Sequence, residues 1–440
     1  MYLKWQTIAV FVAPAIPISA LGLPLLVYLP PFYAEEMGLG LSLVGTIFMI
    51  TRFWDVFTDP VLGIISDKVK TRLGRRRHWI ILSVPILMLS VYQVFMPHSP
   101  VSGTYLLWWM VVLYVGYTLL SISHMSWAAE LSPHYDERSR VQGWREFALF
   151  FGMLTVLLLP ALVEQIAKAS DTLKVSAMGW FTIILLPITV AIAVRMVPEH
   201  PVPKQPKLGF GRAIRLLWHN QPLQRLLIAD LLVGAAPGIT GSLYLFFATH
   251  VLELAQWESL ILLFYFIAGF ISIPGWMRLS YRLEKHRTLA VAMIYASITL
   301  ALMLLLKPGV LWLSVLSIML NGFSSGAGAF LLRSMMADVT DHDNLESGVQ
   351  RTGLYYALLT MTNKISYALA VGFTYPMLDW IGFEPSGTNT AQTIEALKYM
   401  FIFMPMPLML LAAIIMWNFP LDSKRQRELR RLIDERDSSS

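Results

Sequence analysis

Residues 40–66 read GLSLVGTIFMITRFWDVFTDPVLGIIS, an almost continuous apolar run. As a helix this run is roughly 40 Å long, at about 1.5 Å per residue, which is enough to cross a hydrocarbon core of roughly 30 Å. Three charged side chains, those of Arg52, Asp55 and Asp59, interrupt it. Charged groups at membrane depth are costly and usually functional. The stretch therefore predicts both a membrane-spanning helix and the position of a site.

Apolar runs of this kind fill most of the 440-residue chain. It is 56% hydrophobic and 14% charged, whereas soluble domains carry about 25% charged residues. The runs are continuous rather than alternating, which is typical of helices buried in lipid. We predict an all-α membrane protein with twelve transmembrane helices, at residues 6–33, 40–66, 79–96, 103–131, 141–165, 177–197, 223–250, 257–279, 288–306, 310–337, 351–378 and 396–419.

Lysine and arginine gather in alternate loops between these runs. The loops after the second, sixth and eighth predicted helices are basic, whereas the first loop of the opposite set holds Glu35 and Glu36. Basic loops stay on the cytoplasmic side of a membrane. We therefore expect a multi-pass protein of the cell (inner) membrane with both termini in the cytoplasm. The net charge of +6 reflects this topology signal and does not indicate a nucleic-acid partner.

A proline-rich, basic segment divides the chain near its middle. We predict an N-terminal six-helix bundle at 1–197, a central cytoplasmic loop at 198–222, a C-terminal six-helix bundle at 223–419 and a charged cytoplasmic tail at 420–440. Two parallel six-helix repeats joined by a central loop form the plan of the major facilitator fold.

Several chemistries are excluded or unsupported. The chain has no cysteine, which excludes disulfides, thiol catalysis and cysteine-based metal sites. The sequence contains no apparent phosphate-binding loop, metal cluster or nucleophile–base motif. We expect a protein that is not an enzyme, that has no cofactor beyond a coupling ion, and that acts as a monomer.

Two carboxylates in the second predicted helix are the strongest functional signal. Asp55 and Asp59 are four residues apart and so share one helical face. Inside a membrane such a pair needs compensation, which a proton or a cation held between the carboxylates supplies. Arg52 offsets part of the charge. The alternative is a purely structural salt-bridge cluster.

A single lysine, Lys364, lies within the predicted helix at 351–378. An ammonium among apolar neighbours needs an acidic partner. The candidates are Asp55 and Asp59, across the interface between the two halves. A purely structural ion pair is the alternative.

The loop after the second predicted helix combines an acid with dense positive charge, at Asp67, Gly74, Arg75, Arg76 and Arg77. Salt bridges in such a loop can hold the two halves in one state and break in the other. We therefore expect a conformational latch here. Topology signals and binding of anionic lipid headgroups explain the arginines equally well.

These motifs occur together in one pattern. Arg-Phe-Trp-Asp-x3-Asp-Pro at 52–60 precedes Gly-x3-Asp-x6-Gly-Arg-Arg-Arg at 63–77, and Ala-Asp-Val-Thr-Asp at 337–341 and Gln-Arg-Thr-Gly at 350–353 precede Lys364. The pattern resembles the glycoside–pentoside–hexuronide:cation symporter family of the major facilitator superfamily. The resemblance implies a symporter that works by alternating access and is driven by sodium or protons.

The resemblance also implies roles for individual residues. Asp55 and Asp59 would bind the cation, Thr58 and Thr118 would complete its shell, and Lys364 would match the family lysine that couples the halves. Carboxylates combined with neutral oxygens suit a small hard cation, and we favour sodium over the proton.

The solute site departs from the family pattern. Serines stand where galactoside carriers of the family have carboxylates, a methionine lies near an aromatic platform, and one arginine is retained; these residues are Ser19, Ser121, Met125 and Arg145. A serine cannot reproduce the charge-assisted, bidentate grip of a carboxylate, which argues against a galactoside. Arg145 has no acidic partner that the sequence places, because the adjacent Glu146 is expected to point elsewhere.

Three functions stay open. The first is sodium-coupled symport of a small organic solute, sugar-like or an acidic glycoside whose anionic group meets Arg145. The second is transport of a lysolipid or another amphiphile, favoured by the apolar faces of the first and fourth predicted helices. The third is a non-transporting membrane sensor, against which the retained carboxylate pair argues. His124 in the fourth predicted helix is better interpreted as a hydrogen-bonded interior histidine than as a proton relay.

Overall fold

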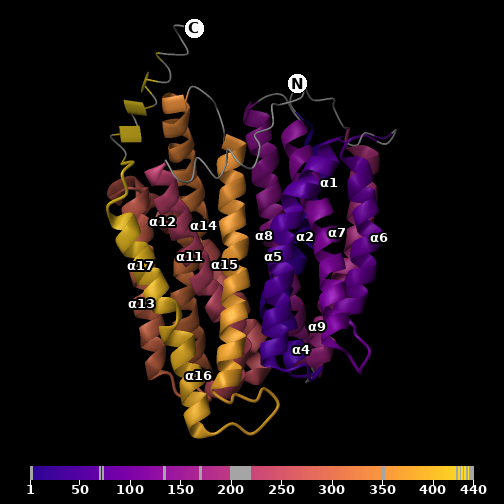
Figure 1. The fold of residues 1–440 in the computed structure, drawn as a ribbon, viewed down its shortest axis with the longest axis vertical. Coiled ribbons are helices and arrows are strands. Elements are labelled where there is room, and N and C mark those ends of the chain that lie inside the picture. The colour runs from indigo at the N-terminus through magenta and orange to yellow at the C-terminus, as the bar shows by residue number, and fades with distance from the viewer. Residues whose placement is uncertain are drawn as a thin grey trace. The chain divides into compact units, whose positions relative to one another are not determined.

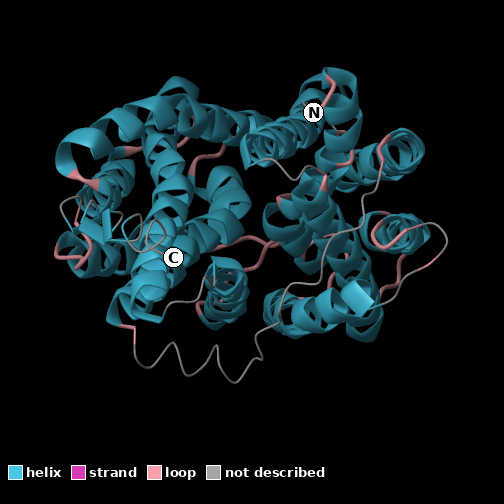
Figure 2. Cartoon of the chain, turned by 90° about the horizontal axis from the view of Figure 1, so that it is seen from above, coloured by secondary structure: helices cyan, strands magenta, loops and turns pink. Residues whose placement is uncertain are grey.

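The computed structural model describes residues 3–68, 71, 74–131, 135–167, 171–198, 220–347 and 352–422, with 425, 426, 428, 429, 431, 432 and 435 in the tail. Regular secondary structure in these residues is helical, apart from an isolated bridge between Thr71 and Gly74. Figure 1 labels these helices along the chain, and Figure 2 shows the chain from above with its helices in cyan. The all-α prediction is confirmed.

The first predicted span is a series of short helices: α1 (Trp5–Val12), α2 (Ala15–Gly22), α3 (Pro24–Val27) and α4 (Leu29–Ala34). Prolines at 14, 24 and 30 explain these breaks, because proline has no N–H to donate and its ring clashes with the preceding turn. The helices that follow are α5 (Leu41–Lys68), α6 (Arg77–Phe95), α7 (Gly103–Glu130), α8 (Tyr135–Ala167), α9 (Asp171–Met196), α11 (Gln221–Phe246), α12 (Glu258–Leu283), α13 (Lys285–Leu302), α14 (Leu311–Ser347), α15 (Thr352–Trp380), α16 (Ala391–Phe403) and α17 (Pro405–Trp417).

Each of the twelve predicted spans coincides with one of these helices or helix series. Within the described residues, 11 helices are long and apolar enough to cross a membrane. The remaining predicted span is α15, which has 29 residues. It is long enough but less apolar, because polar side chains such as Asn363 and Lys364 lie within it. A helix of this kind is tolerated in a membrane when its polar face lies against protein.

Residue contacts divide the chain into two compact units. Unit 1 comprises Met1–Lys204, Ala255–Leu263 and Val371–Thr393, and unit 2 comprises the remaining segments. In unit 1, α7 packs against α5 and α6, α6 against α9, and α2 against α8. In unit 2, α13 packs against α14 and α17, and α17 against α11. Helices α12 and α15 each begin in one unit and end in the other.

The predicted central loop at 198–222 lies mostly outside the described residues, which resume at Asn220, and so does much of the tail at 420–440. The predicted division into two six-helix bundles therefore stays a prediction.

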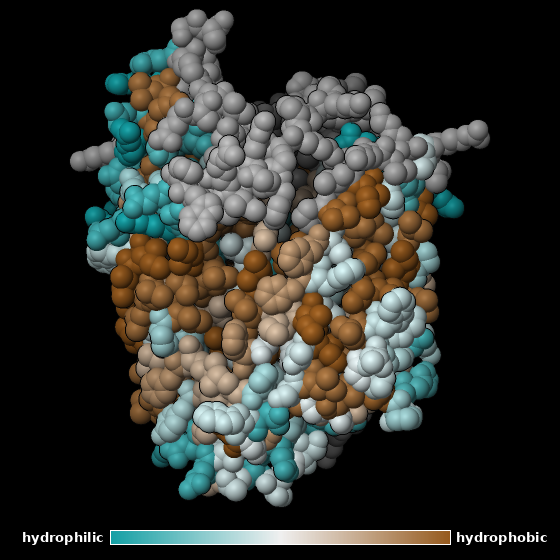
Figure 3. Space-filling view, in the orientation of Figure 1, coloured by the Kyte–Doolittle hydropathy of each residue, from teal (hydrophilic) through white to brown (hydrophobic). Residues whose placement is uncertain are grey.

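The outer surface is apolar over the middle of the helices. On the face drawn in Figure 3, hydrophobic side chains gather there and hydrophilic ones lie toward both ends. Large apolar side chains such as Trp108, Phe147 and Ile184 are exposed. A soluble monomer rarely exposes so much contiguous apolar surface, whereas lipid solvates it. The surface thus agrees with the predicted membrane location.

Candidate cation and solute site

Helices α5 and α7 bring three predicted cation ligands together. The Thr118 hydroxyl oxygen on α7 lies 2.9 Å from Asp55 Oδ1 and 2.8 Å from Asp59 Oδ1 on α5. Asp55 is fully buried and Thr118 is nearly so. The spacing of four residues puts both carboxylates on the face of α5 that α7 covers. Three oxygens from two helices therefore meet in the interior of unit 1.

The two short contacts at Thr118 indicate what this cluster could bind. A threonine hydroxyl has one hydrogen to donate, so it donates fully to only one carboxylate at a time. A proton on a carboxyl group, or a cation beside the oxygens, would make the second contact more favourable. The cluster of Asp55, Asp59 and Thr118 therefore has the chemistry of a site for a proton or a small hard cation.

Two further residues predicted at this site have other contacts. The Thr58 hydroxyl donates to the backbone carbonyl of Asp55 at 3.2 Å, which leaves its lone pairs to accept or coordinate. The Arg52 guanidinium lies over the Tyr114 ring of α7, 5.1 Å from its centroid, in a cation–π contact. Membership of Thr58 in the cation shell stays a prediction.

Lys364 lies on α15, in the part of that helix that belongs to unit 2, and its side chain is half-buried. The two carboxylates of α5 belong to unit 1. The predicted pairing of Lys364 with Asp55 or Asp59 therefore stays a prediction.

The predicted solute residues have contrasting surroundings. Ser19 on α2 donates to the Ile16 carbonyl at 2.9 Å, and it faces α8 where Gly152 allows close packing, because a Cβ there would lie 2.4 Å from Ser19 Oγ. The Ser121 hydroxyl is buried and has no hydrogen-bond partner among the described residues. Met125 is 51% exposed. A buried hydroxyl without a partner is rare, so Ser121 is the better candidate for contact with a polar solute.

The structure corrects the expectation for Arg145. Its Nη1 lies 3.3 Å from Glu146 Oε1, so the adjacent acid does reach it. Neighbouring residues leave a helix in different directions, but both side chains are long enough to bend toward each other. The Glu146 side chain is 51% exposed, whereas that of Arg145 is 8% exposed. Glu146 therefore compensates the buried guanidinium from an exposed position.

His124 fixes the orientation of Arg145. Its Nε2 lies 2.8 Å from the Phe11 carbonyl of α1, and Arg145 Nε lies 3.4 Å from its Nδ1. A carbonyl only accepts hydrogen bonds, so Nε2 carries the hydrogen and Nδ1 accepts from Arg145. The ring also stacks on Phe11. This geometry agrees with the interpretation of His124 as an interior, hydrogen-bonded histidine.

The arginine-rich loop is described only in part. The side chain of Asp67 lies outside the described residues, so the predicted latch is not tested there. Gly74 has φ of 110°, a backbone conformation that favours glycine. Arg77 donates to the Val197 carbonyl at the end of α9 and lies 5.7 Å from the Trp127 ring centroid. Arg75 lies beside Gly74, and Arg76 is buried.

Two groups of buried charges were not predicted from the sequence. Lys174 on α9 contacts Glu164 and Glu258, and Asp230 on α11 accepts a hydrogen bond from the Thr362 hydroxyl. The span predicted at 177–197 begins six residues later than α9, so Lys174 was not recognised as part of a helix. The signal that would have found them all is a charged residue within or beside an apolar run.

Comparison with known proteins places this geometry in context. A family model described as MFS/sugar transport protein matches residues 10–423. The chain is 24% identical over 422 residues to the glucuronide carrier protein homolog of Escherichia coli (strain K12), covering 93% of this chain and 91% of that protein. It is 22% identical over 440 residues to the sodium-dependent lysophosphatidylcholine symporter 1 of Homo sapiens, covering 89% and 80%. A mutant of the nucleoside transporter NupG has a similar fold, with a TM-score of 0.70 at 12% identity, covering 94% of this chain and 100% of that one.

Proposed function

The chain belongs to the MFS/sugar transport protein family, of the glycoside–pentoside–hexuronide type, and from this premise we propose that it is a sodium-coupled symporter of an acidic glycoside or a similar hydroxylated anion. It is a membrane transporter with the major facilitator fold and not an enzyme. The observation that carries the coupling part of the proposal is the meeting of Asp55, Asp59 and Thr118.

The donor set at this cluster supports sodium as the coupling ion. Two carboxylates and a hydroxyl are hard oxygen ligands, and a monovalent cation between them neutralises part of their charge. The name of the human relative states sodium dependence for that protein. A proton on one carboxyl group also satisfies the Thr118 contacts, so proton coupling is the outcome if sodium has no effect.

The proposed solute follows from the polar groups of the N-terminal helices. Arg145 carries a positive charge at a buried position, and the exposed Glu146 side chain contacts it. Ser121 offers a buried hydroxyl. Together they suit a solute with an anionic group and hydroxyls, and the curated relative from Escherichia coli is named for a glucuronide.

A lysolipid or other amphiphile is the second candidate. Ser19 and Ser121 offer no carboxylate to a sugar, Met125 presents an exposed apolar side chain, and the human relative is named for lysophosphatidylcholine. The anionic headgroup of an amphiphile would meet Arg145 in the same way. A non-transporting sensor is disfavoured, because such a protein has no use for a buried carboxylate pair.

Sodium is expected to stabilise the purified protein. A ligand that binds only the native state adds about 2.7 kcal/mol at a concentration of roughly 100 times its Kd. The melting temperature should therefore rise in sodium chloride relative to choline chloride at equal ionic strength. Asp59→Asn should abolish this difference. Glu395→Gln, at an exposed position on α16, is the matched control and should retain it.

Equal melting curves in the two salts would exclude the sodium site.

A separate experiment, uptake into proteoliposomes, identifies the solute class, with methyl glucuronide, methyl glucoside and lysophosphatidylcholine as probes. Uptake of the glucuronide that rises with an inward sodium gradient supports the proposal. Uptake of the lysolipid alone replaces it with the second candidate.

A further inference from the structure

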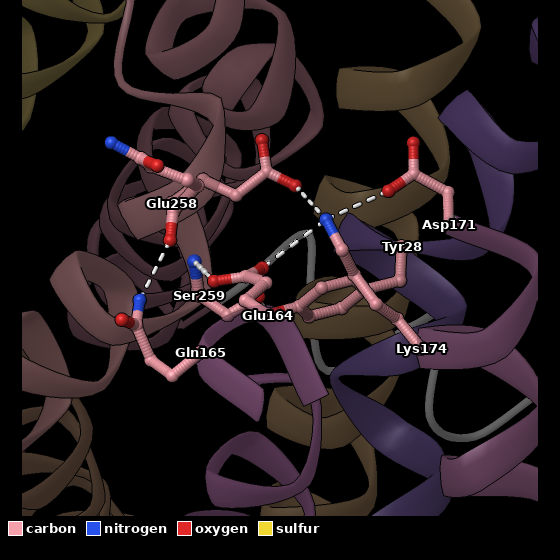
Figure 4. Close-up of polar contacts among 8 residues, drawn as sticks. Tyr28, Glu164, Gln165, Asp171, Lys174, Glu258 and Ser259 are labelled. Carbon is pink, nitrogen blue, oxygen red and sulfur yellow. Dashed lines mark hydrogen bonds and ion pairs between the residues drawn. The ribbon is translucent and has the colours of Figure 1, made fainter. Parts of the chain in front are cut away.

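Lys174 is surrounded by carboxylates in the interior of unit 1 (Figure 4). Its Nζ lies 2.7 Å from Asp171 Oδ1, 2.8 Å from Glu258 Oε1 and 3.2 Å from Glu164 Oε1. The side chains of Lys174, Glu164 and Glu258 are 6%, 2% and 5% exposed. Asp171 is 44% exposed and is therefore partly screened by solvent. The buried part is thus one ammonium between two carboxylates.

A second set of hydrogen bonds holds the first turn of α12 in the same place. The Ser259 hydroxyl donates to Glu164 Oε1, and the Ser259 backbone N–H lies 3.3 Å from Glu164 Oε2. Tyr28, between α3 and α4, donates to the Ser259 hydroxyl at 3.0 Å. Gln165 donates to the Gln256 carbonyl at 2.9 Å. The start of α12 is therefore bonded to α8, α9 and the α3–α4 junction.

The position of this cluster in the chain links it to any movement of unit 2 relative to unit 1. It lies where α8 ends and α9 begins, at the opposite end of α9 from the Val197 carbonyl that Arg77 contacts. The first turn of α12 belongs to unit 1, but the rest of α12 belongs to unit 2. Any rearrangement that moves unit 2 relative to unit 1 must either bend α12 or release its first turn from Lys174.

The energetics make the contact a two-state element. Ions buried this deeply are stable only when they are paired and hydrogen-bonded, and removal of one partner strongly destabilises what remains. A gradual lengthening of the Lys174 contacts would leave Glu164 and Glu258 close together without their shared cation. The favourable arrangements are therefore two, either fully closed or opened far enough for water to solvate each charge.

We infer that Lys174, Glu164 and Glu258 form an ionic latch that seals the transport path on the side opposite the arginine-rich loop and that opens once in every transport cycle. The inference rests on membrane transport by the major facilitator fold. It does not depend on the identity of the coupling ion or of the solute. Lys174 then acts in the transport reaction itself, since the opening of this side is one of its steps.

The test uses the absence of natural cysteine in this chain. A single reporter, Ser121→Cys, is labelled with a membrane-impermeant thiol reagent from each face of oriented vesicles. Lys174→Met keeps the length of the side chain and removes its charge, and is expected to raise the labelling rate from the side of the latch by about 5- to 150-fold, the usual range of conformational couplings. The rate from the opposite face should fall. Lys174→Arg should restore the rates of the parent.

Controls separate opening of the latch from loss of the fold. Rates are normalised to Trp380→Cys, since Trp380 is 84% exposed in the same unit. A short bifunctional thiol reagent should join the pair Gln165→Cys and Gln256→Cys, which lie on the two sides of this junction and are outside the latch. It should join them more slowly in Lys174→Met than in the chain with the native lysine.

Three results would overturn the latch. One is an unchanged labelling rate in Lys174→Met. Another is a rise from both faces together with a lower melting temperature, which indicates a purely structural cluster. The third is cross-linking of the Gln165→Cys and Gln256→Cys pair at the same rate in Lys174→Met as in the chain with the native lysine. None of these readouts requires sodium or solute, so failure of the latch is distinguishable from failure of the proposed function.

Discussion

Asp55→Asn is expected to abolish uphill transport of the solute while leaving downhill exchange measurable. A cation drives accumulation only if its binding is coupled to that of the solute, and Asp55 is the fully buried member of the cluster. An amide removes the charge that holds the cation and keeps the size of the side chain. The accumulation ratio in proteoliposomes with an inward sodium gradient should fall to about one, the value without coupling.

Thr118 provides the matched control for this experiment. Thr118→Ser keeps the hydroxyl that meets both carboxylates and should retain accumulation, whereas Thr118→Val removes it and should reduce the apparent affinity for sodium. Concentrative uptake by Asp55→Asn at the parental level would show that the coupling ion binds elsewhere.

Arg145→Ala is expected to discriminate between anionic and neutral solutes. Loss of one partner of a buried, hydrogen-bonded charge pair reduces binding by about 2–5 kcal/mol, which is roughly 30- to 4000-fold in affinity. The half-saturating concentration of methyl glucuronide for its own uptake should rise by this factor. That of methyl glucoside should change little. Arg225→Ala, which removes an arginine bonded to the Asn418 carbonyl in unit 2, should affect neither.

An equal loss for both sugars would contradict the assignment and point to a structural role. His124→Phe offers a second readout, because it removes the acceptor that orients Arg145 and keeps a ring that can stack on Phe11. A smaller loss, confined to the anionic sugar, is expected for that variant.

Helix positions could be predicted from hydropathy because lipid imposes one rule on every span, namely that apolar residues face it and backbone polar groups pair internally. The pair Asp55 and Asp59 was equally readable, since a spacing of four residues determines a shared helical face. The contact with Thr118 rested on the family resemblance, and the structure brings the three residues together. Four residues of spacing on one helix say nothing about which helix packs against it.

The remaining features depend on side-chain reach and on helix ends, which sequence patterns determine poorly. Glu146 was expected to point away from Arg145, yet two long side chains meet at 3.3 Å. Lys174 lies in the first turn of α9. The predicted span excluded it because the first turn of this helix is polar and the span was defined by an apolar run. The partner of Lys174, Glu258, lies 84 residues further along, and no local pattern links residues so far apart.

That separation has a consequence for biosynthesis. When the ribosome has delivered Glu164 and Lys174 to the membrane, Glu258 does not yet exist, and the ammonium has only part of its final set of partners. Unit 1 becomes complete only after the segments 255–263 and 371–393 have also been made. A nascent chain that ends at the central loop therefore lacks part of unit 1. The N-terminal helices can complete their packing only after these later segments have entered the membrane.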